Sequence, residues 1–213
     1  KEFRLRKKGA VYKIPGVGLD TGVFHPLPEE ARRAGRERLG IREDEFFLVS
    51  VGELNANKNH KAVLEALVRL RETRRDISHI RYGICGDGFF RSRLERWILE
   101  MGLKNTVTLY GYCLHVADIL GCADAAVFPS IREGLGMAGL EALAMGVPVI
   151  ASDNRGTREY MEHGRNGLVY RHDDISGFAQ GIEILSHMDP DSKKAMRRYC
   201  LDSVRPFEMR YAN

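Results

Sequence analysis

Residues 125–152 have the sequence AAVFPSIREGLGMAGLEALAMGVPVIAS, in which two short apolar runs flank a glycine-containing loop and a helical segment. The first run, residues 125–128, predicts a buried strand that Pro129 stops. Residues 139–145 predict a helix, which the sequence Gly146-Val147-Pro148 ends. Residues 149–151 predict a second strand. A strand, a helix and a strand in this order indicate two parallel strands joined by a helical crossover.

The same alternation continues on both sides of this unit. Further strands are predicted at residues 46–52, 80–85, 107–110 and 167–170, and further helices at residues 60–74, 89–101, 115–122, 175–185 and 192–201. The pattern predicts an α/β fold, a Rossmann-like doubly wound parallel sheet of about six strands with helices on both faces. Ligands bind such sheets at the carboxyl ends of the strands.

Composition narrows the class of protein. The 213 residues are 44% apolar, which favours a globular domain, and the net charge of +4 gives no argument for a nucleic-acid partner. We find no apolar run long enough to span a bilayer and no secretory signal. The four cysteines form no CxxC pair and have no zinc-like spacing, so we expect reduced, buried thiols and a cytosolic location.

The start of the chain differs from the rest. Residues 1–8 are basic, and residues 12–20 are rich in proline and glycine. We expect residues 1–19 to be an interdomain strand or linker remnant and residues 20–213 to form the domain. The basic start could touch anionic lipid, although a solvated terminus is the preferred interpretation.

The loop between the first strand and the helix of residues 125–152 carries the candidate chemistry. Its glycines let a ligand approach the backbone, and the free N–H groups of a helix start favour an anion. Glu133 precedes the helix and Glu141 lies within it. Two carboxylates suit a ligand that has hydroxyls as well as phosphates. On spacing alone, a glycine-rich turn with two solvated glutamates is equally acceptable.

This segment resembles the signature of the retaining glycosyltransferases of the GT-B fold, a family that includes many capsule and exopolysaccharide enzymes. Glu133 and Glu141 have the Glu-x7-Glu spacing of that signature, and the match continues through residues 146–152, 155–159 and 163–169. Weaker matches lie at residues 51–54 with Lys58, at residues 86–88 and at residues 109–112. The resemblance extends from about residue 12 to about residue 185.

The resemblance implies a role for each matching residue. Glu133, the candidate catalytic residue, would meet the donor sugar, Glu141 the ribose, and Lys58 the diphosphate. The phosphates and sugar would be faced by backbone N–H groups of Gly134, Leu135, Gly136 and Met137. The base would be held by backbone groups of Gly111 and Tyr112. Gly52 and Asn57 are further candidates.

Glu53 departs from the family pattern, because many members carry arginine there. A carboxylate beside a diphosphate is unfavourable. We therefore expect Glu53 to turn away from the phosphates, to pair with Lys58 or Lys61, or to meet the sugar or another domain.

The function implied is transfer of a hexosyl group, with retention of configuration, from a nucleotide diphosphate sugar to an acceptor hydroxyl. A UDP-sugar is the donor expected from its frequency in the family, and neither a metal nor a cofactor is expected. The chain resembles only the donor-binding half of a GT-B enzyme. Its partners would be the donor and a missing N-terminal acceptor domain, and the chain alone would be inactive. The full enzyme is expected in the cytoplasm, with possible contact at the inner face of the membrane. The alternatives are a nucleotide-sugar epimerase of the same fold and a non-catalytic nucleotide-binding module.

Overall fold

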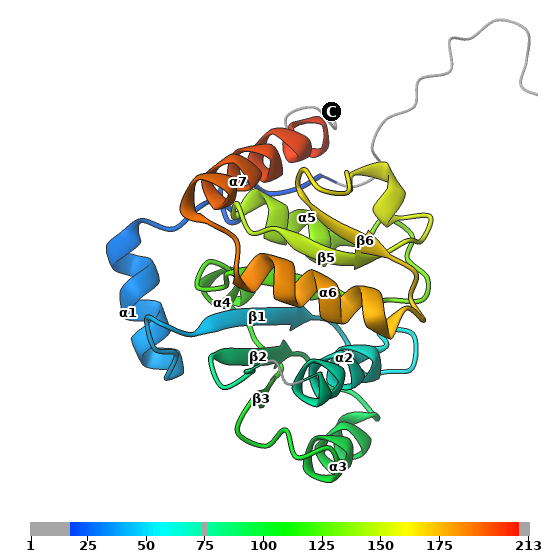
Figure 1. Ribbon diagram of the computed structural model, residues 1–213. Coiled ribbons are helices and arrows are strands. Elements are labelled where there is room, and N and C mark those ends of the chain that lie inside the picture. The colour runs from blue at the N-terminus through cyan, green and yellow to red at the C-terminus, as the bar shows by residue number, and fades with distance from the viewer. Residues whose placement is uncertain (1–17, 74–75, 209–213) are drawn as a thin grey trace, which may run out of the picture.

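The computed structural model describes residues 18–73 and 76–208, and their centre is a parallel sheet (Figure 1). Its strand order is β3-β2-β1-β4-β5-β6. The strands are β1 Phe46–Val51, β2 Ile80–Cys85, β3 Val107–Gly111, β4 Ala125–Phe128, β5 Val149–Ser152 and β6 Gly167–Tyr170. All five neighbouring pairs are parallel, which confirms the fold predicted from the alternation of strands and helices.

Helices cover both faces of the sheet. They are α1 Glu29–Leu39, α2 His60–Glu72, α3 Arg91–Glu100, α4 Val116–Leu120, α5 Met137–Ala144, α6 Ile175–Ser186 and α7 Pro190–Val204, with 3-10 turns η1 Thr157–Glu159 and η2 Arg205–Phe207. The helix α2 packs against α6 and α3, and α5 packs against α7. The central strand β1 is covered on both sides, so Phe47, Leu48 and Val49 are fully buried.

The helix α1 was missed in the sequence-based prediction. Its sequence EEARRAGRERL has no apolar stripe, and it is held to the domain mainly by polar contacts of Arg36. The buried Arg36 guanidinium donates to the carbonyls of Cys122, Arg42 and Glu45 and pairs with Asp124. A pattern of apolar residues cannot reveal a helix that is anchored in this way.

Several helix boundaries differ from the predicted ones by one to three residues. The helix α5 begins at Met137 rather than at residue 139, directly after Gly136. The helix α7 is longer than the predicted 192–201, because the Asp189 carboxylate caps its start and Pro190 occupies its first turn. Of the expected linker at residues 1–19, residues 1–17 lie outside the described part of the chain, and Leu19 is buried and forms a parallel bridge with Glu208.

The cysteines are free thiols within the described residues. Cys85, Cys122 and Cys200 are buried as expected, whereas Cys113 is half-buried. Burial raises the pKa of the Cys200 thiol to about 12, so this thiol stays protonated. In the described part of the chain, every helix is too short or too polar to cross a bilayer.

Candidate functional site

The order of the strands places a switch point between β1 and β4. From β1 the chain proceeds to β2 and β3 on one side, whereas β4, β5 and β6 lie on the other. The loops that follow β1 and β4 therefore leave the sheet at neighbouring positions of its carboxyl edge (Figure 1). This is where doubly wound sheets bind ligands. The loop after β1 contains Glu53 and Lys58, and the loop after β4 contains Glu133.

Asn57 joins these two loops. Its side-chain amide donates to the carbonyl of Arg132 at 2.9 Å, and its side-chain oxygen accepts from the Arg132 amide at 3.1 Å. Its own carbonyl accepts from the Ile131 amide at 2.8 Å. Three hydrogen bonds fix the distance between the loops, so Asn57 positions the loop after β4 relative to the loop after β1.

Lys58 and Glu133 meet across the switch point. The Lys58 ammonium lies 2.7 Å from a Glu133 carboxylate oxygen, and only 20% and 14% of the two side chains are exposed. The ammonium also lies 5.0 Å from the centre of the Phe128 ring, a cation–π distance. The resemblance implies that Lys58 binds the diphosphate and that Glu133 meets the donor sugar, without implying a contact between the two residues. Without a ligand they satisfy each other, so an arriving diphosphate would compete with Glu133 for Lys58.

The start of α5 is shaped by Gly136, which has φ +85. A Cβ on this glycine would lie 2.8 Å from the Phe128 ring, and the Tyr160 hydroxyl donates to the Gly136 carbonyl at 3.0 Å. The first N–H groups of a helix have no acceptor within it and point outward. The preceding Gly134 is exposed, and a Cβ there would meet open space. Gly134 thus offers exposed backbone directly before the start of α5, whereas Gly136 is buried and Leu135 and Met137 are half-buried.

Glu141 lies on α5 and is half-buried. Burial raises the pKa of its carboxyl. Within the described residues, no ion pair or side-chain hydrogen bond involves this carboxylate. A half-buried acceptor without a partner is suited to hydroxyl donors supplied by a ligand.

A cavity of about 300 Å³ lies at the carboxyl ends of β1, β2 and β3. Its lining consists of Val51, Gly52, Glu53, Cys85, Gly86, Asp87, Tyr112, Cys113 and Val116. The structure therefore brings three predicted site residues, Gly52, Glu53 and Tyr112, into one hollow. Gly111, with φ +73, directs the chain from β3 toward this hollow. The size lies at the lower end of the range for small-molecule sites.

The floor of this cavity requires a glycine at position 86. Gly86 has φ +152, and a Cβ there would lie within 2 Å of the Gly52 carbonyl oxygen, at 1.9 Å. The Gly86 amide donates to the Gly111 carbonyl at 2.7 Å. Close backbone contacts through Gly86 therefore hold the loops after β1, β2 and β3 together, and we call these the locked loops.

Glu53 does not pair with Lys58 or Lys61, so that part of the expectation was wrong. Lys58 is occupied by Glu133, and Lys61 pairs with Glu65 at 2.8 Å. Glu53 is exposed, lines the cavity and accepts a hydrogen bond from the Asn55 side chain at 2.9 Å. Its carboxylate is therefore held by Asn55 and not by the ammonium of Lys58.

Two supporting residues were not identified from the sequence. The buried Asn154 accepts from the amides of Gly156 and Thr157 and donates to the Ser130 carbonyl. Tyr160 packs on the start of α5 through its ring and hydroxyl. The Asn-x-Gly sequence at 154–156 is a turn signal that could have revealed the first residue. No local signal reveals the second, because its partner lies 24 positions away.

The part of the chain that the structure describes contains no group of three or more histidine, cysteine, aspartate or glutamate side chains placed to hold a metal ion.

Comparisons with known proteins agree with this geometry. The sequence profile described as "Glycosyl transferases group 1" matches residues 31–200. The protein EpsD of Bacillus subtilis (strain 168) is 39% identical over 182 residues, which cover 85% of this chain and 47% of EpsD. The crystal structure of Anabaena Alr3699/HepE in complex with UDP superimposes with a TM-score of 0.83 at 21% identity, covering 92% of this chain and 53% of that one.

The C-terminal domain of a glycosyl transferase group 1 family protein (LpcC) from Francisella tularensis, solved separately, superimposes with a TM-score of 0.77 at 20% identity. The superposition covers 100% of that domain and 90% of this chain. The chain spans about half the length of the EpsD relative, so the matched region corresponds to one part of a longer protein there.

Proposed function

Because this chain belongs to the glycosyl transferases group 1 family, we propose that it is the donor-binding part of a glycosyltransferase that retains anomeric configuration. The donor is a nucleotide diphosphate sugar, and the acceptor is a hydroxyl. The observation that carries the proposal is the Lys58–Glu133 pair at the switch point, because it joins a phosphate-binding cation to a hydroxyl-binding carboxylate at 2.7 Å.

The proposed binding mode distributes the donor along the carboxyl edge. The base occupies the cavity beside Gly111 and Tyr112, and the ribose hydroxyls donate to Glu141. The diphosphate binds the Lys58 ammonium and the backbone N–H groups from Gly134 to Met137. Glu133, released from Lys58, then accepts from hydroxyls of the sugar. Lys58 and the helix start stabilise the charge that develops on the leaving diphosphate, so a metal ion is not needed.

UDP is the nucleotide that we propose, with a hexose as the transferred sugar. The similar Anabaena protein was crystallised with UDP, which supports this choice of base. A role in cytoplasmic synthesis of a surface polysaccharide, at the inner face of the membrane, is proposed from the family resemblance. The acceptor site is assigned to a second, N-terminal domain that this chain does not include.

The test is a thermal-shift panel of UDP, GDP, ADP and their glucose conjugates, with and without excess chelator. A ligand that binds only the folded state raises its stability, so UDP compounds are expected to raise the melting temperature most, and a chelator is expected to make no difference. Stabilisation by none of the nucleotides would contradict the proposal. Loss of stabilisation in chelator, restored by Mg²⁺, would contradict the metal-independent mode alone.

A further inference from the structure

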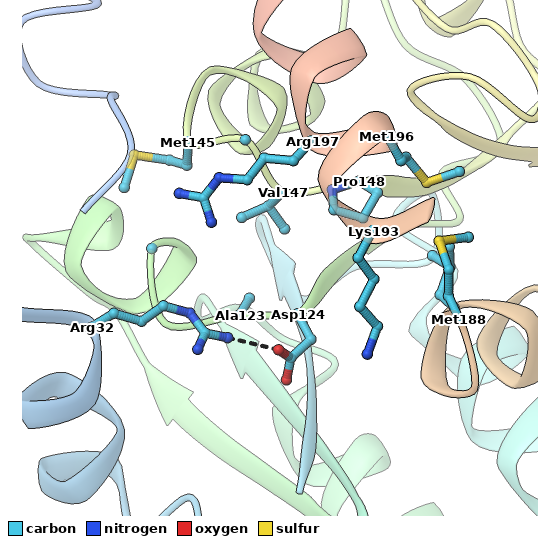
Figure 2. A pocket seen from close by; sticks show the side chains of 13 residues that line it. Arg32, Ala123, Asp124, Met145, Val147, Pro148, Met188, Lys193, Met196 and Arg197 are labelled. Atoms are coloured by element: carbon cyan, nitrogen blue, oxygen red, sulfur yellow. Dashed lines mark hydrogen bonds and ion pairs between the residues drawn. The ribbon is translucent and has the colours of Figure 1, made fainter. Parts of the chain in front are cut away.

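A second hollow lies at the opposite, amino edge of the sheet (Figure 2). We call it the basic hollow, and it is lined by Arg32, Gly121, Ala123, Asp124, Met145, Gly146, Val147, Pro148, Leu185, Met188, Lys193, Met196 and Arg197. Asp124 immediately precedes β4 and Pro148 immediately precedes β5. The four residues of each strand separate it from the donor edge, a length of about 13 Å at the usual rise of a strand. It is thus a separate place on the molecule.

Three cationic side chains surround this hollow. Figure 2 shows Arg32 approaching from α1 and Lys193 and Arg197 extending from α7. The carboxylate of Asp124 is already satisfied, because it pairs with Arg32 at 2.6 Å and with Arg36 at 3.0 Å and accepts from the Phe47 amide. The lining contains three cationic residues and one carboxylate, which leaves an excess of positive charge.

Lys193 and Arg197 have no acidic partner in the described part of the chain. They are four positions apart on α7, so they lie one above the other on the same side of the helix. Like charges at this spacing repel each other. Gly146 leaves room for the stem of Arg197, since a Cβ there would lie 2.9 Å from its Cγ. Two exposed, mutually repelling cations without an acidic partner among the described residues are an arrangement that an anion would stabilise.

The floor of the hollow is apolar. Met145, Val147, Leu185 and Met196 are buried beneath it, and Pro148 and Met188 complete it. Methionine side chains adapt readily to the shape of an apolar ligand. The volume is about 120 Å³, well below the range for nucleotide-sized ligands. The space suits an anionic group with a few carbon atoms.

We propose that the basic hollow binds a small organic phosphate. The Arg197 guanidinium can donate two hydrogen bonds to phosphate oxygens, Arg32 can donate through the N–H groups that its pair with Asp124 leaves free, and Lys193 adds a point charge. The carbon part of the ligand lies on the methionine and proline floor. The ligand is either a free phosphate ester or the headgroup end of an anionic phospholipid, because both present this chemistry. The proposal is independent of the donor site.

The test measures binding of butyl phosphate by calorimetry, with inorganic phosphate and 1-butanol as reference probes. The Lys193→Ala/Arg197→Ala double variant is expected to bind butyl phosphate about tenfold more weakly or worse, since two charge-assisted contacts are lost. Its matched control is Lys194→Ala/Arg198→Ala, which removes the same charges one position along the same exposed helix. A Lys58→Ala variant excludes binding at the donor edge and is expected to bind butyl phosphate normally.

Equal losses in the two double variants, loss in Lys58→Ala, or no binding by the unmodified chain would overturn the proposal. Should the alanine pair lower the melting temperature, Lys193→Gln/Arg197→Gln provides a second variant of similar side-chain length. Flotation with phosphatidylcholine vesicles, with and without phosphatidylglycerol, distinguishes the sources of the phosphate. Flotation that needs both phosphatidylglycerol and the Lys193–Arg197 pair identifies the lipid, whereas binding in solution alone identifies a free ester.

Discussion

At the scale of single residues, the Lys58–Glu133 pair makes Lys58 the strongest candidate for a ligand contact. An ammonium that is mostly buried and paired with one carboxylate can exchange that partner for a diphosphate of higher charge at little cost in desolvation. In the proposed binding mode, Glu133 then becomes free when the donor binds. The proposed exchange would couple binding of the diphosphate to release of the carboxylate that meets the sugar.

Lys58→Ala is expected to weaken UDP binding about tenfold or more, because a charge-assisted contact worth about 1.5–3 kcal/mol is lost. Uridine, which lacks phosphate, should lose less. Calorimetric titration of both ligands measures the difference. Lys61→Ala is the control, since Lys61 pairs with Glu65 and not with the site. Unchanged UDP affinity in Lys58→Ala would show that this loop does not bind the phosphates.

Glu141→Gln is expected to have opposite effects on stability and on binding. The raised pKa of the Glu141 carboxyl means that the folded chain holds this proton more tightly than the unfolded chain does. Stability is therefore lost as pH rises from the usual carboxyl pKa through the raised one. The amide carries no charge, so the variant should melt at a higher temperature near neutral pH. It should bind UDP about tenfold more weakly, since a neutral acceptor is weaker.

Melting curves at several pH values and UDP titrations, run on the same samples, test this prediction. A lower melting temperature with unchanged UDP affinity would make Glu141 a purely structural residue.

His60 is a second residue whose charge is controlled by burial. Burial, together with the positive charge of Lys58, lowers the pKa of His60 to about 4. Its Nδ1 lies 3.3 Å from the Tyr82 hydroxyl, which in turn lies 2.7 Å from the Ser50 hydroxyl. Below the ordinary histidine pKa of about 6.5, the unfolded chain takes up a proton that the folded chain does not.

The contribution of neutral His60 to the free energy of unfolding is thus fully present above about pH 6.5. This contribution falls by about 3 kcal/mol in total as the pH decreases toward 4. Urea unfolding between these pH values should show a steep loss in the unmodified chain and a shallower one in His60→Gln. His25→Gln, which changes an exposed histidine, should keep the steep slope. Parallel slopes in the unmodified chain and in His60→Gln would refute the assignment.

At the scale of elements, the strands were predicted better than the helices. The strands are short, mostly apolar runs, so each of the six was found within a residue or two of its observed limits. The helix α1 was missed because Arg36 anchors it through distant carbonyls. The relation of Lys58 to Glu133 was also not predicted, since it depends on the switch in strand order. Sequence indicated that both residues belong to the site but not that they touch.

The locked loops at the carboxyl edge give a prediction about Gly86. Gly86→Ala would put a methyl group against the backbone carbonyl of Gly52, at a positive φ, and neither atom can move without disturbing two loops. We expect a loss of about 2–4 kcal/mol in the free energy of unfolding. Gly134→Ala, where the added Cβ meets nothing within 4 Å, should stay within about 0.5 kcal/mol of the unmodified chain. Urea denaturation of both variants provides the comparison, and equal stabilities would mean that the loops are not locked.

At the scale of the whole molecule, the carboxyl edge carries large apolar side chains that the described residues leave uncovered. Phe89, Tyr112 and Leu114 are 82%, 78% and 80% exposed. They lie in the loops that follow β2 and β3, and Tyr112 lines the cavity proposed for the base. Large exposed apolar side chains are typical of a surface that meets another part of a protein. The chain spans 47% of the EpsD relative, so a second part of comparable length exists in that protein.

This arrangement predicts that the chain by itself binds UDP but transfers no sugar. The donor edge alone holds one substrate in a site that is open to water, whereas transfer needs an acceptor hydroxyl held in line with the sugar and water kept out. The measurement incubates the chain with labelled UDP-glucose and a panel of acceptors, and follows acceptor product, free glucose and any epimer. UDP titration of the same sample shows that the site is folded. Acceptor-dependent product from this chain alone would mean that the described edge contains a complete catalytic site. UDP binding without product is the expected result, because the acceptor position is proposed to lie in a second domain.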